Sequence, residues 1–238
     1  DVVFNCAVIP LPTSLTRPEW TIRKNVDMTL NLCRLIREEG YRSLVQFSSS
    51  EAVGSARLVP MKEDHPLDPE TPYAASKAAT DTIALSYHHT FGSDILLVRP
   101  YNQYGPRQNA GRYAGIIPLM IGRMLKRQEV TILGDGEQTR DYLHVKDTVD
   151  GVIAAYCSNE SRGTCINLGS GTEISVNDLV EQLVELTGYP HKLIRYDAPR
   201  PGDVRRHCAD ISKARTLLGW EPKIAFAQGL EQTVNWYL

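Results

Sequence analysis

The sequence lacks the features that mark several large classes of protein. No apolar run approaches the roughly 20 residues that a membrane-spanning helix requires. The five cysteines stand far apart, at positions 6, 33, 157, 165 and 208, and include no C-x-x-C pair. An odd number at this spacing argues against a disulfide framework and indicates reduced thiols. We therefore expect a cytoplasmic protein that does not bind a membrane.

The charge balance is also unremarkable. Lysine and arginine together number 26 against 28 aspartates and glutamates, which gives a net charge of −2. A nucleic-acid-binding protein typically has a basic excess, so no nucleic-acid partner is predicted. The six histidines show no metal-ligand spacing, and the adjacent pair at 88–89 would need further ligands, so no metal is predicted.

What the sequence does contain is an alternation of strand-like and helical segments. Such alternation is typical of an α/β fold built on a parallel sheet. Short apolar runs predict strands at residues 1–7, 43–47, 95–98, 130–133, 165–168 and 193–196, the first of them buried. Apolar residues at helical spacing predict helices at 18–39, 72–89, 115–126, 146–156 and 175–187, with two more before residue 238.

Residues 47–77 combine a strand end rich in hydroxyls with the start of a helix. Three serines, at 48–50, close the strand. Thr71-Pro72 then introduces the helix, because threonine caps free amides and proline suits the first helical position. Tyr73 and Lys77 lie four residues apart and therefore share one face of that helix.

This arrangement can move a proton. A phenol has a reference pKa of about 10, and the ammonium of Lys77 would favour the phenolate of Tyr73. A serine hydroxyl from the strand end could share the proton of an alcohol substrate while hydride leaves the same carbon. Taken alone, a tyrosine and a lysine at this spacing are more often surface residues. The serines at 48–50 and the Arg99-Pro100 pair after the next strand favour the catalytic interpretation.

Further motifs follow in order along the chain. In addition to Ser49, Tyr73 and Lys77, they are RPYNQYGPR at 99–107, QTRDYLHV at 138–145, INLG at 166–169 and RPGD at 200–203. With this set the chain resembles the extended short-chain dehydrogenase/reductase family and, within it, the nucleotide-sugar epimerases and dehydratases. No single motif is decisive, but their joint order and spacing are specific and cover essentially the whole chain.

The resemblance implies an α/β fold with a doubly wound, Rossmann-like parallel sheet that is incomplete at its N-terminus, and a smaller mixed α/β lobe. Residues 1–101, joined by about 141–170, would form the Rossmann-like part with the catalytic residues. Residues 102–140 and 171–238 would form the lobe that binds the nucleotide sugar.

Members of this family begin with a Gly-rich turn that cradles the cofactor pyrophosphate, and no such turn stands near the start of this sequence. We therefore expect either a fragment that lacks about the first quarter of the fold or a truncated protein that has lost normal cofactor binding. The cofactor that the resemblance implies is NAD. The residues expected to bind it are Cys6, Ala7, Asn25, Ser48, Tyr73, Lys77 and Pro100.

The resemblance implies four catalytic residues, Ser49, Tyr73, Lys77 and Glu51. Dehydratases of the family usually have an Asp-Glu pair where this chain has Ser50-Glu51, so the glutamate is kept and the aspartate is missing. A Ser-Glu pair is more similar to the sugar-acid decarboxylases.

The implied substrate is a nucleotide-diphosphate sugar, either a UDP- or a dTDP-linked hexose. Family members bind its sugar, base, diphosphate and ribose, and control the size of the sugar, at positions matching Asn102, Ile116, Thr131, Leu133, Arg140, Arg200, Asp203 and His207.

A 4-epimerase that works through a 4-keto intermediate needs no further acid or base, which suits a site without the dehydratase aspartate. Two alternatives stay open. Glu51 could support 4,6-dehydration or the decarboxylation of UDP-glucuronate. A different class of protein, a catalytically silent module that binds a nucleotide sugar or a partner, would fit the missing Gly-rich turn. Family members commonly dimerise through helices that match residues 18–39 and 72–89, so a homodimer is expected.

Overall fold

The computed structural model describes residues 1–111, 114–200 and 202–238, and a four-stranded sheet lies at its centre. Pro201, part of the last motif, is outside these residues. All neighbouring strands of the sheet are parallel, so their carboxyl ends meet at one edge, where open parallel sheets bind ligands. The expected α/β fold is therefore confirmed. The order is β1 (Val2–Asn5), β2 (Ser43–Phe47), β3 (Asp94–Pro100) and β8 (Cys165–Leu168).

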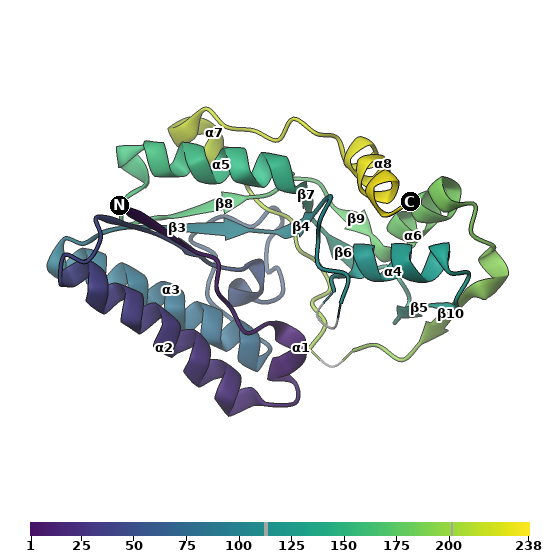
Figure 1. The fold of residues 1–238 in the computed structure, drawn as a ribbon, viewed down its shortest axis with the longest axis horizontal. Helices are drawn as coiled ribbons and strands as arrows, with labels where there is room; N and C mark the ends of the chain where they lie inside the picture. The colour runs from purple at the N-terminus through teal and green to yellow at the C-terminus, as the bar shows by residue number, and fades with distance from the viewer. Residues whose placement is uncertain (112–113, 201) are drawn as a thin grey trace.

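Helices cover both faces of this sheet (Figure 1). Successive side chains of a strand point to opposite faces. In β3, Ile95 and Leu97 pack in the core beneath α2 and α3, whereas Leu96 and Val98 pack in the core beneath α5 and α7. The bounds are α1 (Leu11–Ser14), α2 (Pro18–Arg37), α3 (Pro72–Phe91), α5 (Val145–Cys157) and α7 (Ser212–Leu218).

β1 differs from the buried strand predicted for residues 1–7. It is shorter, and only Asn5 is buried, whereas the Phe4 side chain is 40% exposed. The reason is its place at one end of the strand order, where β2 is its one strand neighbour among the described residues. The Asn5 amide is satisfied there by donating to the Gln46 side chain at 2.8 Å.

α3 starts as the sequence predicts. Thr71 is its N-cap, and the threonine hydroxyl accepts a hydrogen bond of 3.1 Å from the backbone N–H of Ala74. The helix runs two residues beyond the predicted end, to Phe91. It stops at Gly92, whose φ of +67° is a left-handed conformation that glycine adopts without strain. The cap holds the first turn, which carries Tyr73.

The smaller lobe lies beside the sheet, where α4, α6 and α8 gather (Figure 1). It has an apolar core of its own, to which Ile121, Leu179, Leu183 and Leu230 contribute. Three helices surround this core, and a pair of parallel strands, β5 and β10, lies beside them. The bounds are α4 (Ile116–Leu125), α6 (Val176–Thr187), α8 (Phe226–Tyr237), β5 (Val130–Leu133), β10 (Ile194–Asp197) and the 3₁₀ turn η3 (His191–Leu193).

Short strands connect the lobe to the sheet. β4 pairs with β7 in parallel, and β6 pairs with β9 in antiparallel orientation. The sequence does not predict these strands, because segments of two or three residues carry no periodicity. They nevertheless place Asn102 and Arg140 at the boundary between sheet and lobe. The bounds are β4 (Asn102–Tyr104), β6 (Thr139–Arg140), β7 (Tyr142–His144), β9 (Ile174–Ser175), and the 3₁₀ turns η1 (Ser50–Val53) and η2 (Asn159–Ser161).

Candidate active site

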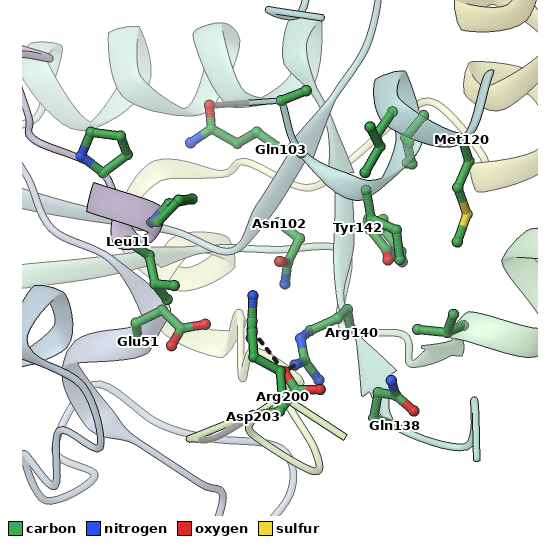
Figure 2. Close-up of a pocket in the computed structure, with 18 of the residues that line it drawn as sticks. Leu11, Glu51, Asn102, Gln103, Met120, Gln138, Arg140, Tyr142, Arg200 and Asp203 are labelled. Carbon is green, nitrogen blue, oxygen red and sulfur yellow. Dashed lines mark hydrogen bonds and ion pairs between the residues drawn. The ribbon is translucent and has the colours of Figure 1, made fainter. Parts of the chain in front are cut away.

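A cavity of about 720 Å³ opens between the carboxyl ends of the strands and the lobe. Figure 2 shows Glu51 on one side of it and Arg140, Arg200 and Asp203 close together opposite. The cavity brings together twelve of the residues singled out from the sequence. They are Ser48, Ser49, Glu51, Tyr73, Pro100, Asn102, Ile116, Thr131, Leu133, Arg140, Arg200 and Asp203.

Tyr73 and Ser49 both line the sheet side of the cavity, where the Ser49 side chain lies near enough to the Tyr73 phenol to lower its pKa. Ser49 is also the N-cap of η1, and its hydroxyl accepts a hydrogen bond of 3.3 Å from the backbone N–H of Glu51. The turn after β2 therefore fixes Ser49 against the first turn of α3. A phenol and a hydroxyl placed in this way can both reach one substrate oxygen.

The pKa of Tyr73 moves in the direction opposite to the one predicted. Burial raises it, the carboxylates of Glu51 and Asp81 add to the rise, and the hydrogen bond from Ser49 opposes it. Among the described groups, Lys77 is not one of those that shift this pKa. The phenol therefore holds its proton more strongly than a free tyrosine does.

The place of Lys77 explains this difference. Its ammonium is buried one helical turn beyond Tyr73, donates to the carbonyl of Phe47 at 2.5 Å and lies beside Asp81. Burial lowers the pKa of Lys77, and the nearby Asp81 and Cys6 oppose that fall. The charge of Lys77 is therefore directed at the strand end and at Asp81.

Glu51 also holds its proton more strongly than usual. Burial raises the pKa of Glu51, and Asp203 and Glu70 add to the rise, whereas Arg140 and Arg200 oppose it. Figure 2 shows its carboxyl group at the cavity. A carboxyl group with a raised pKa is suited to donate a proton near neutral pH.

On the lobe side, two arginines share one carboxylate. Arg140 and Arg200 each donate to Oδ1 of Asp203 at 2.8 Å, and Arg140 also donates to the carbonyl of Val204 at 2.6 Å. Two guanidinium groups against one carboxylate leave a net positive charge at the cavity. Guanidinium groups bind phosphate oxygens well, so this cluster, the Arg140–Arg200–Asp203 clamp, fits a diphosphate.

Other lining residues extend the cavity beyond the clamp. Nδ2 of Asn102 is buried and has no partner among the described residues, so it is a donor that a ligand could use. The sequence reasoning missed several lining residues. Helical spacing could have found Met120, four residues after Ile116 on α4. Gln103, Gln138 and Tyr142 lie within the motifs at 99–107 and 138–145, which could have indicated them, whereas no sequence pattern marks Leu11.

Four of the residues predicted to bind the cofactor lie outside the cavity lining: Lys77, and Cys6, Ala7 and Asn25 in or beside the loop after β1. Cys6 and Ala7 are exposed directly after the strand. Asn25 is buried in α2, where it accepts a hydrogen bond of 2.7 Å from the Ile9 N–H and donates to the Ser76 hydroxyl at 2.8 Å. In the structure Asn25 therefore ties the loop after β1 to α3, and its contact with a cofactor stays a prediction.

The strand ends fit a nicotinamide dinucleotide. Within the described part of the chain, the ammonium of Lys77 has one hydrogen-bond acceptor, the carbonyl of Phe47, although it carries three N–H donors. Two donors are thus left for the hydroxyls of a ribose. The small, exposed Cys6 and Ala7 leave room for such a group beside the strand ends.

His207 lies behind the wall of the cavity and is fully buried. Its Nε2 donates to the carbonyl of Gly54 at 3.0 Å, and its ring packs edge-on against Tyr101. Burial and the nearby Arg140 lower the pKa of His207 to about 4, so the imidazole is neutral near pH 7. Its predicted effect on the size of the bound sugar stays a prediction.

Across residues 1–111, 114–200 and 202–238, no three His, Cys, Asp or Glu side chains gather in a way that could hold a metal ion. None of the helices there combines the length and the apolarity that crossing a bilayer requires. All five cysteines are free thiols.

Comparisons with known proteins agree with this geometry. The family model for GDP-mannose 4,6-dehydratase matches residues 1–233. The chain is 35% identical over 237 residues to a putative UDP-glucose 4-epimerase of Methanocaldococcus jannaschii, covering 99% of this chain and 76% of the relative. It is 36% identical to a dTDP-glucose 4,6-dehydratase of Streptomyces griseus, covering 100% of this chain and 71% of the relative.

Solved structures give the same result. A UDP-glucose 4-epimerase of Thermotoga maritima, crystallised with UDP-glucose, superposes with a TM-score of 0.94 at 32% identity, over 99% of this chain and 76% of that one. A dTDP-glucose 4,6-dehydratase of Streptomyces venezuelae, crystallised with NAD bound, superposes with a TM-score of 0.94 at 31% identity, over 100% of this chain and 73% of that one. The similarity thus includes epimerases and dehydratases to the same degree.

Proposed function

Because the chain belongs to the GDP-mannose 4,6-dehydratase family of the extended short-chain dehydrogenases, we propose that it epimerises a nucleotide-diphosphate sugar at C4 through a 4-keto intermediate. The observation that carries this proposal is the contact between Tyr73 and Ser49 inside the cavity, opposite the Arg140–Arg200–Asp203 clamp. Epimerisation and dehydration of a nucleotide sugar would both begin with oxidation at C4, so the later step is what must be tested.

In the proposed reaction, Tyr73 as phenolate takes the proton of the C4 hydroxyl, and Ser49 hydrogen bonds with the same oxygen. NAD⁺, held by Lys77 and the strand ends, would supply the acceptor and later the donor of the C4 hydride. Its positive charge would favour the phenolate of Tyr73, whose pKa burial otherwise raises. Between the two hydride transfers the 4-keto sugar turns over, so that hydride would return to the opposite face of C4. Tyr73 then returns the proton to the C4 oxygen.

The binding roles follow from the places of the residues. The clamp would hold the diphosphate, Asn102 would donate to the sugar or a phosphate, and the apolar end of the cavity would take the uracil or thymine base. Lys77 would hold the nicotinamide ribose with its two remaining donors. The other residues proposed to bind NAD are Cys6, Ala7, Asn25, Ser48, Tyr73 and Pro100.

Product analysis tests the proposal. The protein is incubated with NAD⁺ and, separately, with UDP-glucose, UDP-GlcNAc, UDP-glucuronate and dTDP-glucose, and the sugars are identified by NMR. A C4 epimer from one of them is the expected result. Binding of these compounds without any product would instead favour a catalytically silent binding module.

A second candidate reaction is supported by Glu51. Its carboxyl lines the cavity, and burial raises its pKa, which is what a group that protonates a leaving hydroxyl requires. A stable 4-keto-6-deoxy product from dTDP-glucose, or CO₂ released from UDP-glucuronate, would establish this candidate and reject the epimerase. Glu51→Gln separates the two, because it should abolish dehydration or decarboxylation and leave epimerisation largely intact.

We also propose that the protein acts as a cytoplasmic homodimer. Apolar side chains on α2 and α3, among them Ile22, Leu30 and Phe91, are 37–48% exposed and support a contact between two copies. The pairing of β8 with β3 supports a Rossmann-like part made of residues 1–101 and about 141–170. Sedimentation analysis and limited proteolysis would test these two proposals.

A further inference from the structure

Three consecutive residues, the last of β2 and the two that follow it, each lie against a different residue of α3, and two of them hydrogen bond to it. The three α3 residues stand four apart and form one stripe on the helix. Two of the contacts involve residues already proposed to act in catalysis. The third, between a serine hydroxyl and an aspartate, has no role in the reaction described above. The three pairs are Phe47 with Lys77, Ser48 with Asp81, and Ser49 with Tyr73.

Asp81 is placed to act on its neighbours. It is 3% exposed, and its Oδ2 accepts a hydrogen bond from the Ser48 hydroxyl. The buried Arg99 lies 3.6 Å from the same oxygen and also donates to the Ser48 hydroxyl at 3.4 Å. Lys77 stands one turn earlier on the same helix face. Oδ1 of Asp81 has no hydrogen-bond partner within the described residues, so the carboxylate lies between two buried cations without being saturated.

We propose that Asp81 is a positioning residue of the active site, which holds the Ser48 turn in place and keeps the ammonium of Lys77 charged and seated on the carbonyl of Phe47. The Ser48 backbone joins that carbonyl to Ser49, so a bond at Ser48 steadies both catalytic contacts. The backbone N–H of Ser48 donates to Val98 at 2.8 Å, and the hydroxyl bond to Asp81 fixes the side of the turn that faces α3. The proposal rests on the proposed function only where it treats Tyr73 and Lys77 as catalytic.

The charges in this cluster oppose the effect of burial. Burial raises the pKa of Asp81, and Arg99, the hydrogen bond from Ser48 and Lys77 oppose the rise. Burial lowers the pKa of Lys77, and Asp81 opposes the fall, so Asp81 helps Lys77 to remain protonated. Burial raises the pKa of the Cys6 thiol, and the charge of Lys77 opposes the rise. The titratable or charged groups that act on this set are Tyr73 on α3, Glu51 on η1, Arg99 on β3, Cys165 on β8, and Glu63 in the loop beside Arg99.

Cys6 offers a test that needs no substrate. In a Cys157→Ser background it is the one exposed thiol among the five cysteines, and the pH dependence of its alkylation by iodoacetamide reports its pKa. Asp81→Asn keeps the shape of the side chain and removes its charge. Lys77 should then lose its proton at lower pH, so the alkylation midpoint of Cys6 should rise by about half a pH unit, in the direction of a Lys77→Met variant. The matched control is Asp147→Asn, at a buried aspartate on α5.

The result that overturns the proposal is a Cys6 midpoint in Asp81→Asn equal to that of Asp147→Asn. If Asp81→Asn does not fold by circular dichroism, Ser48→Ala decides, because it removes the donor to Asp81 and changes no formal charge. In Ser48→Ala the alkylation midpoint of Cys6 should rise by a smaller amount than in Asp81→Asn. A midpoint equal to that of the parent protein overturns the proposal. A rise of the midpoint in a protein that yields no epimerised sugar would support this role of Asp81 and reject the proposed function, so the two failures are distinguishable.

Discussion

The end of β2 with α3, and the Arg140–Arg200–Asp203 clamp, face the same cavity but are built in different ways. Tyr73 and Lys77 sit on a long helix beside the end of β2, where Lys77 donates to the carbonyl of Phe47 and Tyr73 lies near Ser49. Arg140 sits in a two-residue strand, and Arg200 is held through Asp203, three residues away in a loop. A proton transfer needs its groups in place before the substrate arrives, whereas a charge clamp can adjust to a diphosphate. The difference predicts that substitutions in the first region reduce turnover, whereas substitutions in the clamp weaken substrate binding.

The largest effect should come from removing the phenol at the catalytic end. Tyr73→Phe keeps the ring and should reduce turnover by about 10³-fold, because the base is lost. Binding of the nucleotide sugar should hardly change, because the clamp is untouched. Steady-state kinetics and isothermal titration calorimetry measure the two quantities. Tyr87→Phe, on the same helix, is the matched control, and normal turnover in Tyr73→Phe would remove this residue as the base.

His207 joins the two regions and should control how stability depends on pH. Its pKa is about 4 in the folded protein, against about 6.5 for a free histidine. Between these values the unfolded chain binds the proton and the folded protein does not, so stability falls as the pH drops from 7 to 4, by about 3 kcal/mol. The physical cause is burial, with Nδ1 lacking an acceptor in the described residues.

Urea unfolding at both pH values measures this effect. His207→Gln can still donate to the carbonyl of Gly54 and should flatten the pH dependence by about the same amount. His89→Gln, at an exposed ring, is the matched control. An acid loss of stability as large in His207→Gln as in the wild type would show that other groups are responsible.

The sequence predicts local features of the site better than its long-range contacts. The cap at Thr71 and the spacing of Tyr73 and Lys77 are local, and the structure reproduces them. The sign of the Tyr73 pKa shift is not local, because it depends on burial and on the charge of Asp81, two helical turns away. In the same way, no periodicity shows that Lys77 would bond to the carbonyl of Phe47, 30 residues earlier.

The long-range contacts of the lobe are equally hard to predict from the sequence. The Arg140 and Asp203 motifs are visible in the sequence, but their hydrogen bond joins residues 63 positions apart, and β6 and β7 are too short to be recognised. The buried His207 side chain likewise depends on a hydrogen bond to the carbonyl of Gly54, 153 residues away. Such contacts arise from packing, which a single sequence does not display.

At the clamp, a conservative change should weaken binding rather than chemistry. Arg140→Lys keeps the positive charge but cannot reproduce the forked contacts with Asp203, Val204 and a diphosphate. Binding of UDP or dTDP should weaken by about 2 kcal/mol, or roughly thirtyfold. Calorimetry with the nucleotide alone measures this without turnover. Arg205→Lys, at an exposed pair with Asp135, should leave binding unchanged. A loss confined to kcat would contradict the assignment of Arg140 to binding.

The smallest effect is expected from N-cap hydrogen bonds, which occur in both regions. Thr71 caps α3 and Ser175 caps α6, by accepting bonds of 3.1 and 2.9 Å from the backbone N–H groups three residues later. Replacing either with alanine should lower the free energy of unfolding by about 1 kcal/mol. Only Thr71→Ala should also reduce turnover, by about threefold, because the first turn of α3 carries the phenol of Tyr73 and small displacements of a reacting group slow the reaction. Denaturant unfolding and kinetics on both variants measure the pair. If Ser175→Ala slowed turnover as much as Thr71→Ala, the lobe would depend on fixed placement as strongly as the catalytic helix does, and the contrast between the two regions would not hold.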